Sequence, residues 1–152
     1  MEALRENMAI KQVEPPIAHE ILSGDPAAVY LDVRTEEEFA QGHPQGAINI
    51  PVMFMIPGQP QLNSDFLTVA EAVLPKGRKL IVGCLAGGRS QRACELLEDA
   101  GYTDLTNVRG GFGGQRDTSG QVVVKGWRDA GLPVSQDLDN AAYAALRAKA
   151  SL

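Results

Sequence analysis

The 152-residue sequence has little of what marks metal-binding, disulfide-stabilised or membrane proteins. Two Cys and two His are too few for a disulfide framework and match no zinc-ligand spacing, so we expect no metal and no cofactor. A run of about 18 apolar residues is absent, so no membrane span is expected. The charged N-terminus lacks the apolar stretch of a secretory signal, and we expect a cytoplasmic protein.

An excess of basic charge is also missing. The net charge of −5 argues against general nucleic-acid binding. Hydrophobic residues make up 44% and charged residues 22%, which is ordinary for a globular protein, and the length suits one domain over residues 1–152. No feature of the sequence indicates an oligomeric state.

Apolar strand patterns alternate with helical patterns along the chain. The expected strands are residues 9–13, 27–33, 46–50, 80–82 and 105–108. The expected helices are 17–22, 36–41, 65–74, 90–100 and a C-terminal helix or tail at about 137–152, while 51–61 is expected to be a loop. Continuous apolar strands separated by helices predict an α/β fold with a central, mostly parallel sheet of about five strands and helices on both faces.

The run from Cys84 to Ser90 has the composition of a reactive-thiol loop. It reads Cys84, Leu85, Ala86, Gly87, Gly88, Arg89, Ser90 and joins an expected strand to an expected helix. A thiolate is favoured at a helix N-terminus, and the glycines let backbone N–H groups face inward around an anion. Arg89 adds a permanent positive charge, and Ser90 is expected to cap the helix. The run therefore predicts Cys84 as the catalytic nucleophile, with residues 85–90 as the substrate-binding loop.

Two other residues are expected to support this loop. Asp32 lies at the end of the expected strand 27–33 and Arg34 directly follows it, and the carboxyl ends of parallel strands meet at one edge of a sheet. Asp32 is expected to accept hydrogen bonds or pair with an arginine, and Arg34 to pair with a carboxylate or reach the mouth of the site. Cys94 falls inside the expected helix and is interpreted as a structural residue.

Three stretches in order resemble the rhodanese family. Residues 31–39 with 42–51 are similar to the family's N-terminal signature, the Cys84–Ser90 run to its active-site loop, and Gly110–Phe112 with Trp127 and 131–133 to its closing signature. The chain resembles a single rhodanese domain over about residues 10–134. One departure is the stretch 113–126, which separates Gly111 from Trp127 and reads as an inserted hairpin or loop.

The resemblance implies a thiosulfate sulfurtransferase. Such an enzyme moves a sulfane sulfur from thiosulfate or a related donor onto Cys84 as a persulfide, and then to cyanide or a thiol, with a protein acceptor as a further option. The partners implied are small-molecule donors and acceptors, with no nucleic acid and no membrane.

Three alternatives stay open at this point. A rhodanese-like module can act as a sulfur carrier or partner-binding unit, and Cys84 can act as a redox sensor if it forms a disulfide with Cys94. A Cys-based phosphatase is the remaining alternative, but its loop needs five residues between Cys and Arg, whereas four separate Cys84 from Arg89.

Overall fold

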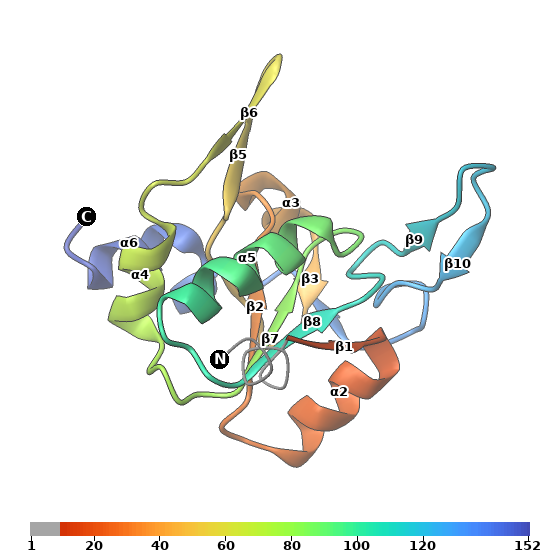
Figure 1. The fold of residues 1–152 in the computed structure, drawn as a ribbon, viewed down its shortest axis with the longest axis horizontal. Coiled ribbons are helices and arrows are strands. Elements are labelled where there is room, and N and C mark those ends of the chain that lie inside the picture. Colours follow the sequence, from red (N-terminus) through yellow and green to blue (C-terminus); the bar gives the residue numbers. More distant parts are fainter. Residues whose placement is uncertain (1–9) are drawn as a thin grey trace, which may run out of the picture.

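A five-stranded sheet forms the centre of the computed structural model, which describes residues 10–152. Its order is β1 (Lys11–Val13), β8 (Leu105–Val108), β7 (Leu80–Gly83), β2 (Val29–Asp32) and β4 (Ile48–Asn49) (Figure 1). Each neighbouring pair of strands is parallel. The predicted α/β class and the five-stranded sheet are confirmed, although the first residue of the expected strand 9–13 lies outside the described part.

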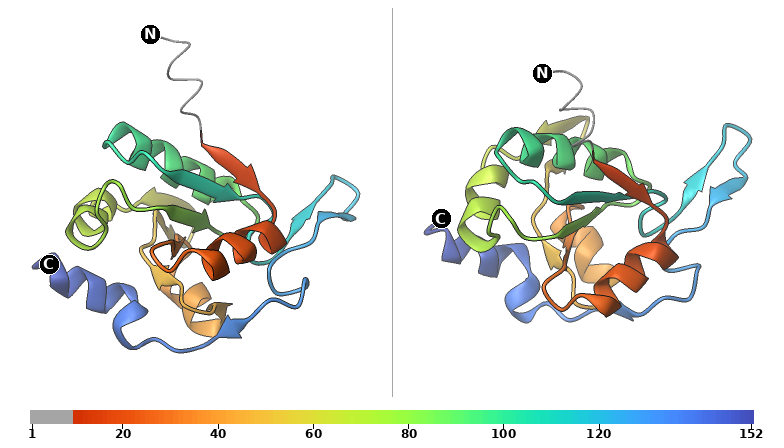
Figure 2. Two further views of the ribbon diagram at one scale, coloured as in Figure 1. Left: turned by 90° about the horizontal axis from the view of Figure 1, so that it is seen from below. Right: turned by 60° about the horizontal axis from the view of Figure 1, so that its bottom comes forward.

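Helices cover both faces of this sheet (Figure 2). One face packs against α4 (Phe66–Val73), α5 (Gly88–Asp99) and α6 (Tyr143–Lys149), and the other against α2 (Pro15–Gly24) and α3 (Glu36–Gln41). Neighbouring strand residues point to opposite faces, so Leu31 joins the first core and Tyr30 the second. This two-sided burial explains why the central strands read as continuous apolar runs.

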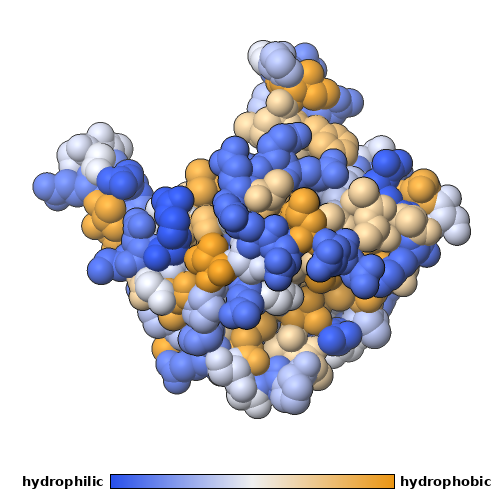
Figure 3. Space-filling model, turned by 180° about the vertical axis from the view of Figure 1, so that it is seen from behind, coloured by the Kyte–Doolittle hydropathy of each residue, from blue (hydrophilic) through white to orange (hydrophobic). Residues whose placement is uncertain are grey.

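Two antiparallel hairpins project from the sheet (Figures 1 and 3). One pairs β5 (Met53–Ile56) with β6 (Gln59–Leu62), and the other pairs β9 (Gln115–Arg116) with β10 (Val122–Val124). The expectation of a loop over 51–61 is therefore wrong. The second strand of the β5–β6 hairpin, Gln59–Leu62, contains a proline, which weakens the strand pattern in the sequence. Gly58, at φ +81°, lies in the turn between the two strands.

The remaining elements are short and bring the C-terminal part back to the sheet. β3 (His43–Pro44) pairs with β11 (Val134–Ser135), and a 3-10 turn, η1 (Asp139–Ala141), precedes α6. Within residues 10–152, no helix is long and apolar enough to cross a membrane.

Candidate active site

The structure places Cys84 in the turn between β7 and α5, at the carboxyl edge of the sheet. The side chain is only 2% exposed, yet its sulfur faces polar groups. The Gly87 N–H donates a hydrogen bond to Sγ at 3.0 Å, and Ser90 Oγ lies 3.3 Å from the same atom. The sulfur therefore accepts a main-chain hydrogen bond at the N-terminus of α5, where the partial positive charge of the helix lies.

A glycine-rich segment holds the Cys84 loop from outside. Phe112 N–H donates to the Cys84 carbonyl at 2.8 Å, Gly113 N–H to the Leu85 carbonyl at 2.8 Å, and Gly110 N–H to the Ala86 carbonyl at 3.1 Å. A Cβ on Gly111 would lie 2.4 Å from the Cys84 carbonyl oxygen, so only glycine allows this close backbone contact. Sequence reasoning connected Gly110–Phe112 with the family but not with this contact.

Arg89 forms a two-pronged ion pair with Glu38 of α3. Its Nη1 and Nη2 donate to the two Glu38 carboxylate oxygens at 2.7 and 3.0 Å. Burial opposes ionisation of Glu38, but hydrogen bonds from Arg89 and Thr35 outweigh it and hold its pKa at about 2. The Glu38 hydrogen bonds in turn raise the pKa of Arg89 above its ordinary value. Thr35 and Glu38 also form a capping box at the start of α3, and the sequence pattern gives no sign that Glu38 binds Arg89.

Asp32 and Arg34 form a buried pair next to this ion pair. Arg34 Nη2 donates to Asp32 Oδ2 at 2.8 Å and to the Gly42 carbonyl at 2.7 Å. The Arg34 guanidinium also lies 4.5 Å from the centre of the Phe112 ring. The two residues thus fasten the end of β2 to the start of β3 and to the segment that holds the Cys84 loop.

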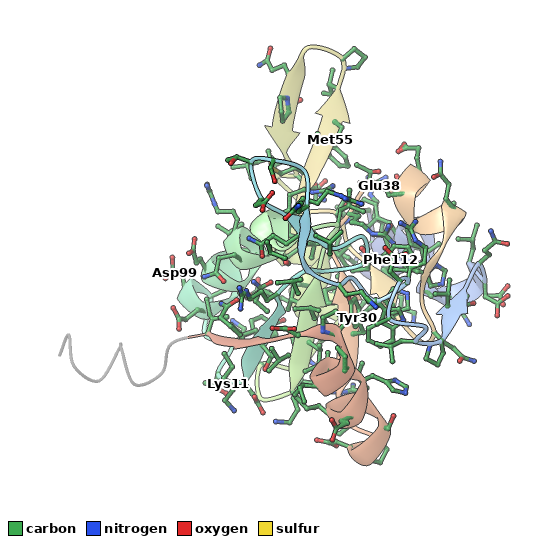
Figure 4. All side chains as sticks on the ribbon, turned by 90° about the vertical axis from the view of Figure 1, so that its right-hand side faces the viewer. Lys11, Tyr30, Glu38, Met55, Asp99 and Phe112 are labelled. Atoms are coloured by element: carbon green, nitrogen blue, oxygen red, sulfur yellow. The ribbon has the colours of Figure 1, made fainter. Side chains whose placement is uncertain are left out.

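Two hollows flank the loop, and Glu38 and Phe112, both labelled in Figure 4, line one of them. The first, of about 350 Å³, is lined by Leu85, Phe112, Arg34, Glu38 and Arg128, among others. The second, of about 510 Å³, is lined by Ala86, Gly87, Gly88, Gln12, Gln91, Asn107 and Arg109, among others. The loop therefore separates two surface hollows.

Comparison with known proteins agrees with this geometry. Residues 15–116 match the model of the rhodanese-like domain. The chain belongs to this family. It is 39% identical over 107 residues to Thiosulfate sulfurtransferase 16, chloroplastic, of Arabidopsis thaliana, which covers 70% of this chain and 88% of that protein. The crystal structure of Rv0390 from M. tuberculosis superposes with a TM-score of 0.70 at 33% identity, covering 84% of this chain and 98% of that one.

Another similar protein is considerably longer. Protein HIGH ARSENIC CONTENT 1, mitochondrial, of Arabidopsis thaliana is 48% identical over 83 residues, which are 55% of this chain and 49% of that protein. This rhodanese-like chain therefore spans about half the length of that relative.

Ser90 does not cap α5 as the sequence suggests. The helix of this rhodanese-like domain begins at Gly88, with Gly87 at the N-cap, and no side-chain cap is present. Gly87 has φ +125°, which lets the chain enter the helix two residues earlier than expected. Ser90 lies in the first helical turn, where its Oγ donates to the Gly87 carbonyl at 3.1 Å or faces Cys84.

Cys94 lies in the core of the domain on the buried side of α5. Both cysteines are free, and burial raises the pKa of Cys94 to about 12. A thiol in this state is a weak nucleophile at neutral pH.

Within residues 10–152, no cluster of three or more potential metal ligands occurs.

Proposed function

We propose that the chain is a sulfurtransferase that moves a sulfane sulfur from thiosulfate or a related donor to cyanide or a thiol through a Cys84 persulfide. The observation that carries the proposal is the hydrogen bond from the Gly87 N–H to Sγ of Cys84 at the start of α5. Relatives named thiosulfate sulfurtransferase, at 38–41% identity over part of the chain, support it.

The reaction proceeds in two half-reactions. The Cys84 thiolate attacks the outer sulfur of thiosulfate, the Sγ–S bond forms, and the S–S bond of thiosulfate breaks with its electron pair leaving on sulfite. The negative charge then rests on the outer sulfur of the persulfide. Cyanide or a thiolate attacks that sulfur, the Sγ–S bond breaks, and its electrons return to Cys84. Covalent catalysis of this kind gives ping-pong kinetics.

The loop residues have distinct roles in this proposal. The N–H groups of residues 85–90 hold the outer sulfur and its charge, as an oxyanion hole holds oxygen. Arg89 contributes positive charge near the sulfur while its ion pair with Glu38 keeps the loop in place. Asp32 and Arg34 stabilise the surroundings of the loop through their buried ion pair and take no part in the reaction itself.

Steady-state kinetics of two cysteine variants test the proposal. Cys84→Ser should abolish thiocyanate formation from thiosulfate and cyanide, because the attacking sulfur is gone. Cys94→Ser should keep most of the activity, because Cys94 is buried in the core. The wild-type chain should show parallel lines in double-reciprocal plots. Equal turnover by Cys84→Ser and wild type would contradict the assignment.

A protein acceptor is the second candidate. Both hairpins follow strands, β4 and β8, whose carboxyl ends lie at the same edge of the sheet as Cys84. Their exposed apolar side chains are Met55, Ile56, Leu62, Val122 and Val123. Exposed apolar surface at the edge of the sheet that carries Cys84 favours a protein partner that receives sulfur from the same persulfide.

Phosphatase chemistry fits the site less well. A Cβ on Gly83 would lie 1.9 Å from the Tyr30 hydroxyl, so the His that commonly precedes a phosphatase Cys has no room. The loop of four residues between Cys84 and Arg89 also makes a cradle smaller than phosphate needs.

A further inference from the structure

A chain of side-chain hydrogen bonds runs from the sulfur of Cys84 across the end of the sheet to the surface of α5. Ser90 Oγ lies 3.3 Å from Sγ and also contacts Asn107 Oδ1. Asn107 is 4% exposed and lies on β8, where it is paired in register with Gln12 of β1. The parallel pairing of these two strands therefore places both amides beside the catalytic loop.

The direction of this chain is set at its far end. The carboxylate of Glu95 can only accept, so Gln91 Nε2 donates to it at 3.3 Å. Gln91 Oε1 is then the acceptor for Gln12 Nε2 at 2.7 Å, and Gln12 Oε1 the acceptor for Asn107 Nδ2 at 2.9 Å. Asn107 Nδ2 also donates to the Gly87 carbonyl at 3.3 Å. With its NH₂ group committed in this way, Asn107 turns its Oδ1 to Ser90.

The Ser90 hydroxyl has a single proton to donate. When the Ser90 hydroxyl donates its proton to Asn107 Oδ1, a lone pair of Ser90 Oγ faces Sγ. This lone pair can accept from a Cys84 thiol but cannot form a hydrogen bond with a thiolate. When Cys84 is a free thiolate, donation from Ser90 to Sγ requires the hydroxyl to leave both competing acceptors, Asn107 Oδ1 and the Gly87 carbonyl. In the persulfide the charge moves to the outer sulfur and Sγ becomes a weak acceptor. The hydrogen bond from Ser90 to Asn107 then no longer competes with a strong hydrogen bond to Sγ.

We propose that Asn107, oriented by Gln12, Gln91 and Glu95, is a positioning residue that withdraws the Ser90 hydroxyl from the free thiolate and so favours the sulfur-loaded form of Cys84. The inference rests on the proposed sulfurtransferase function. It assigns a role to the edge strand β1, whose Gln12 lies far from Cys84 in the sequence.

The test measures the ratio of persulfide to free enzyme at equilibrium in mixtures of thiosulfate and sulfite, by intact-protein mass spectrometry. Asn107→Leu keeps the side-chain size and removes one of the two oxygens that accept from Ser90, leaving the Gly87 carbonyl, so the hydroxyl turns more readily to the thiolate. The ratio should fall by roughly three- to tenfold, the effect of about one hydrogen bond. Thr106→Val, the next residue on β8 with its side chain on the opposite face, is the control and should leave the ratio unchanged.

Glu95→Gln extends the test to the exposed end of the chain, where folding is not at risk. The new amide can donate as well as accept, so the chain loses its fixed direction and the ratio should fall by a smaller factor. Glu98→Gln, with the same charge change on the same helix, is its matched control. A merely structural role for Asn107 would lower the melting temperature and leave the ratio alone.

The outcomes separate this inference from the function beneath it. Loading of the wild type together with unchanged ratios in Asn107→Leu and Glu95→Gln overturns the inference only. A wild-type chain that takes up no sulfur overturns the proposed function and the inference with it. If Asn107→Leu does not fold, the ratio for Glu95→Gln against Glu98→Gln decides.

Discussion

Glu38 stabilises two parts of the molecule at once. Its carboxylate accepts from the Thr35 N–H at the start of α3 and from the Arg89 guanidinium across the site. Glu38 is therefore both the capping-box residue of α3 and the partner of Arg89 in the Cys84 loop. The loop around Cys84 is held in its shape partly by a helix on the other face of the sheet.

The Glu38–Arg89 ion pair predicts an acid-dependent loss of stability. The folded pKa of Glu38 is about 2 and the ordinary value is 4.5, so the pair's contribution is complete above about pH 4.5 and is lost as the pH falls towards 2. Glu38→Gln should be less stable at neutral pH and should lose less stability over that acid range. Urea unfolding at a series of pH values measures both.

Glu37→Gln, an exposed neighbour in the same helix, is the control for this experiment. Its unfolding curve should follow the wild type at every pH. Parallel pH curves for Glu38→Gln and wild type would show that the ion pair does not form in solution.

The sequence pattern predicts Cys84 as the nucleophile and residues 85–90 as its loop, but it does not indicate the contacts that Glu38 and Gln12 make. Cys84, the glycines and Arg89 lie within six consecutive residues, so the sequence is enough to predict that they act together. Glu38 lies 51 positions from Arg89, and Gln12 lies 95 from Asn107. Contacts of that kind exist only once the strands have their order in the sheet, which the sequence pattern does not specify.

Among the elements, those buried on both sides were the most predictable. β2, β7 and β8 lie inside the sheet, and burial on both faces requires a continuous apolar run. The β5–β6 hairpin has no such requirement, because most of its side chains face solvent. Its strand pattern is correspondingly weak, and the expectation of a loop was wrong there.

The β9–β10 hairpin divides into an anchored base and an exposed tip. Val124 at the base is buried against Gly110, and Gly114 packs against the Val124 carbonyl at the same level. The tip, residues 117–121, is exposed throughout. The base of the hairpin therefore supports the segment that holds the Cys84 loop, whereas the tip faces solvent.

Replacing residues 117–121 by a two-residue turn tests this division. Sulfur loading from thiosulfate and transfer to cyanide should stay within about twofold of the wild type, because the Gly110–Gly113 contacts with the loop are kept. The kinetic constants of both half-reactions measure this. Lost loading in a variant that still melts cooperatively would make the tip part of the active site.

At the scale of the whole molecule, the parallel sheet collects the functional groups at one edge. Cys84 follows β7, Asp32 ends β2, Asn107 precedes the end of β8, and each hairpin follows a strand end. The two cores on either side fix the positions of α3 and α5, which provide Glu38 and Arg89. The site therefore depends on the packing of both faces, and the sequence order alone shows only the part of it next to Cys84.

Persulfide formation at Cys84 is the central claim, and intact-protein mass spectrometry after exposure to thiosulfate tests it most directly. The wild type should gain the mass of one sulfur atom and lose it on addition of cyanide, and Cys94→Ser should behave in the same way. Cys84→Ser should gain nothing. Two results would contradict the account: a wild-type chain that gains no sulfur after exposure to thiosulfate, or a sulfur adduct that still forms in Cys84→Ser.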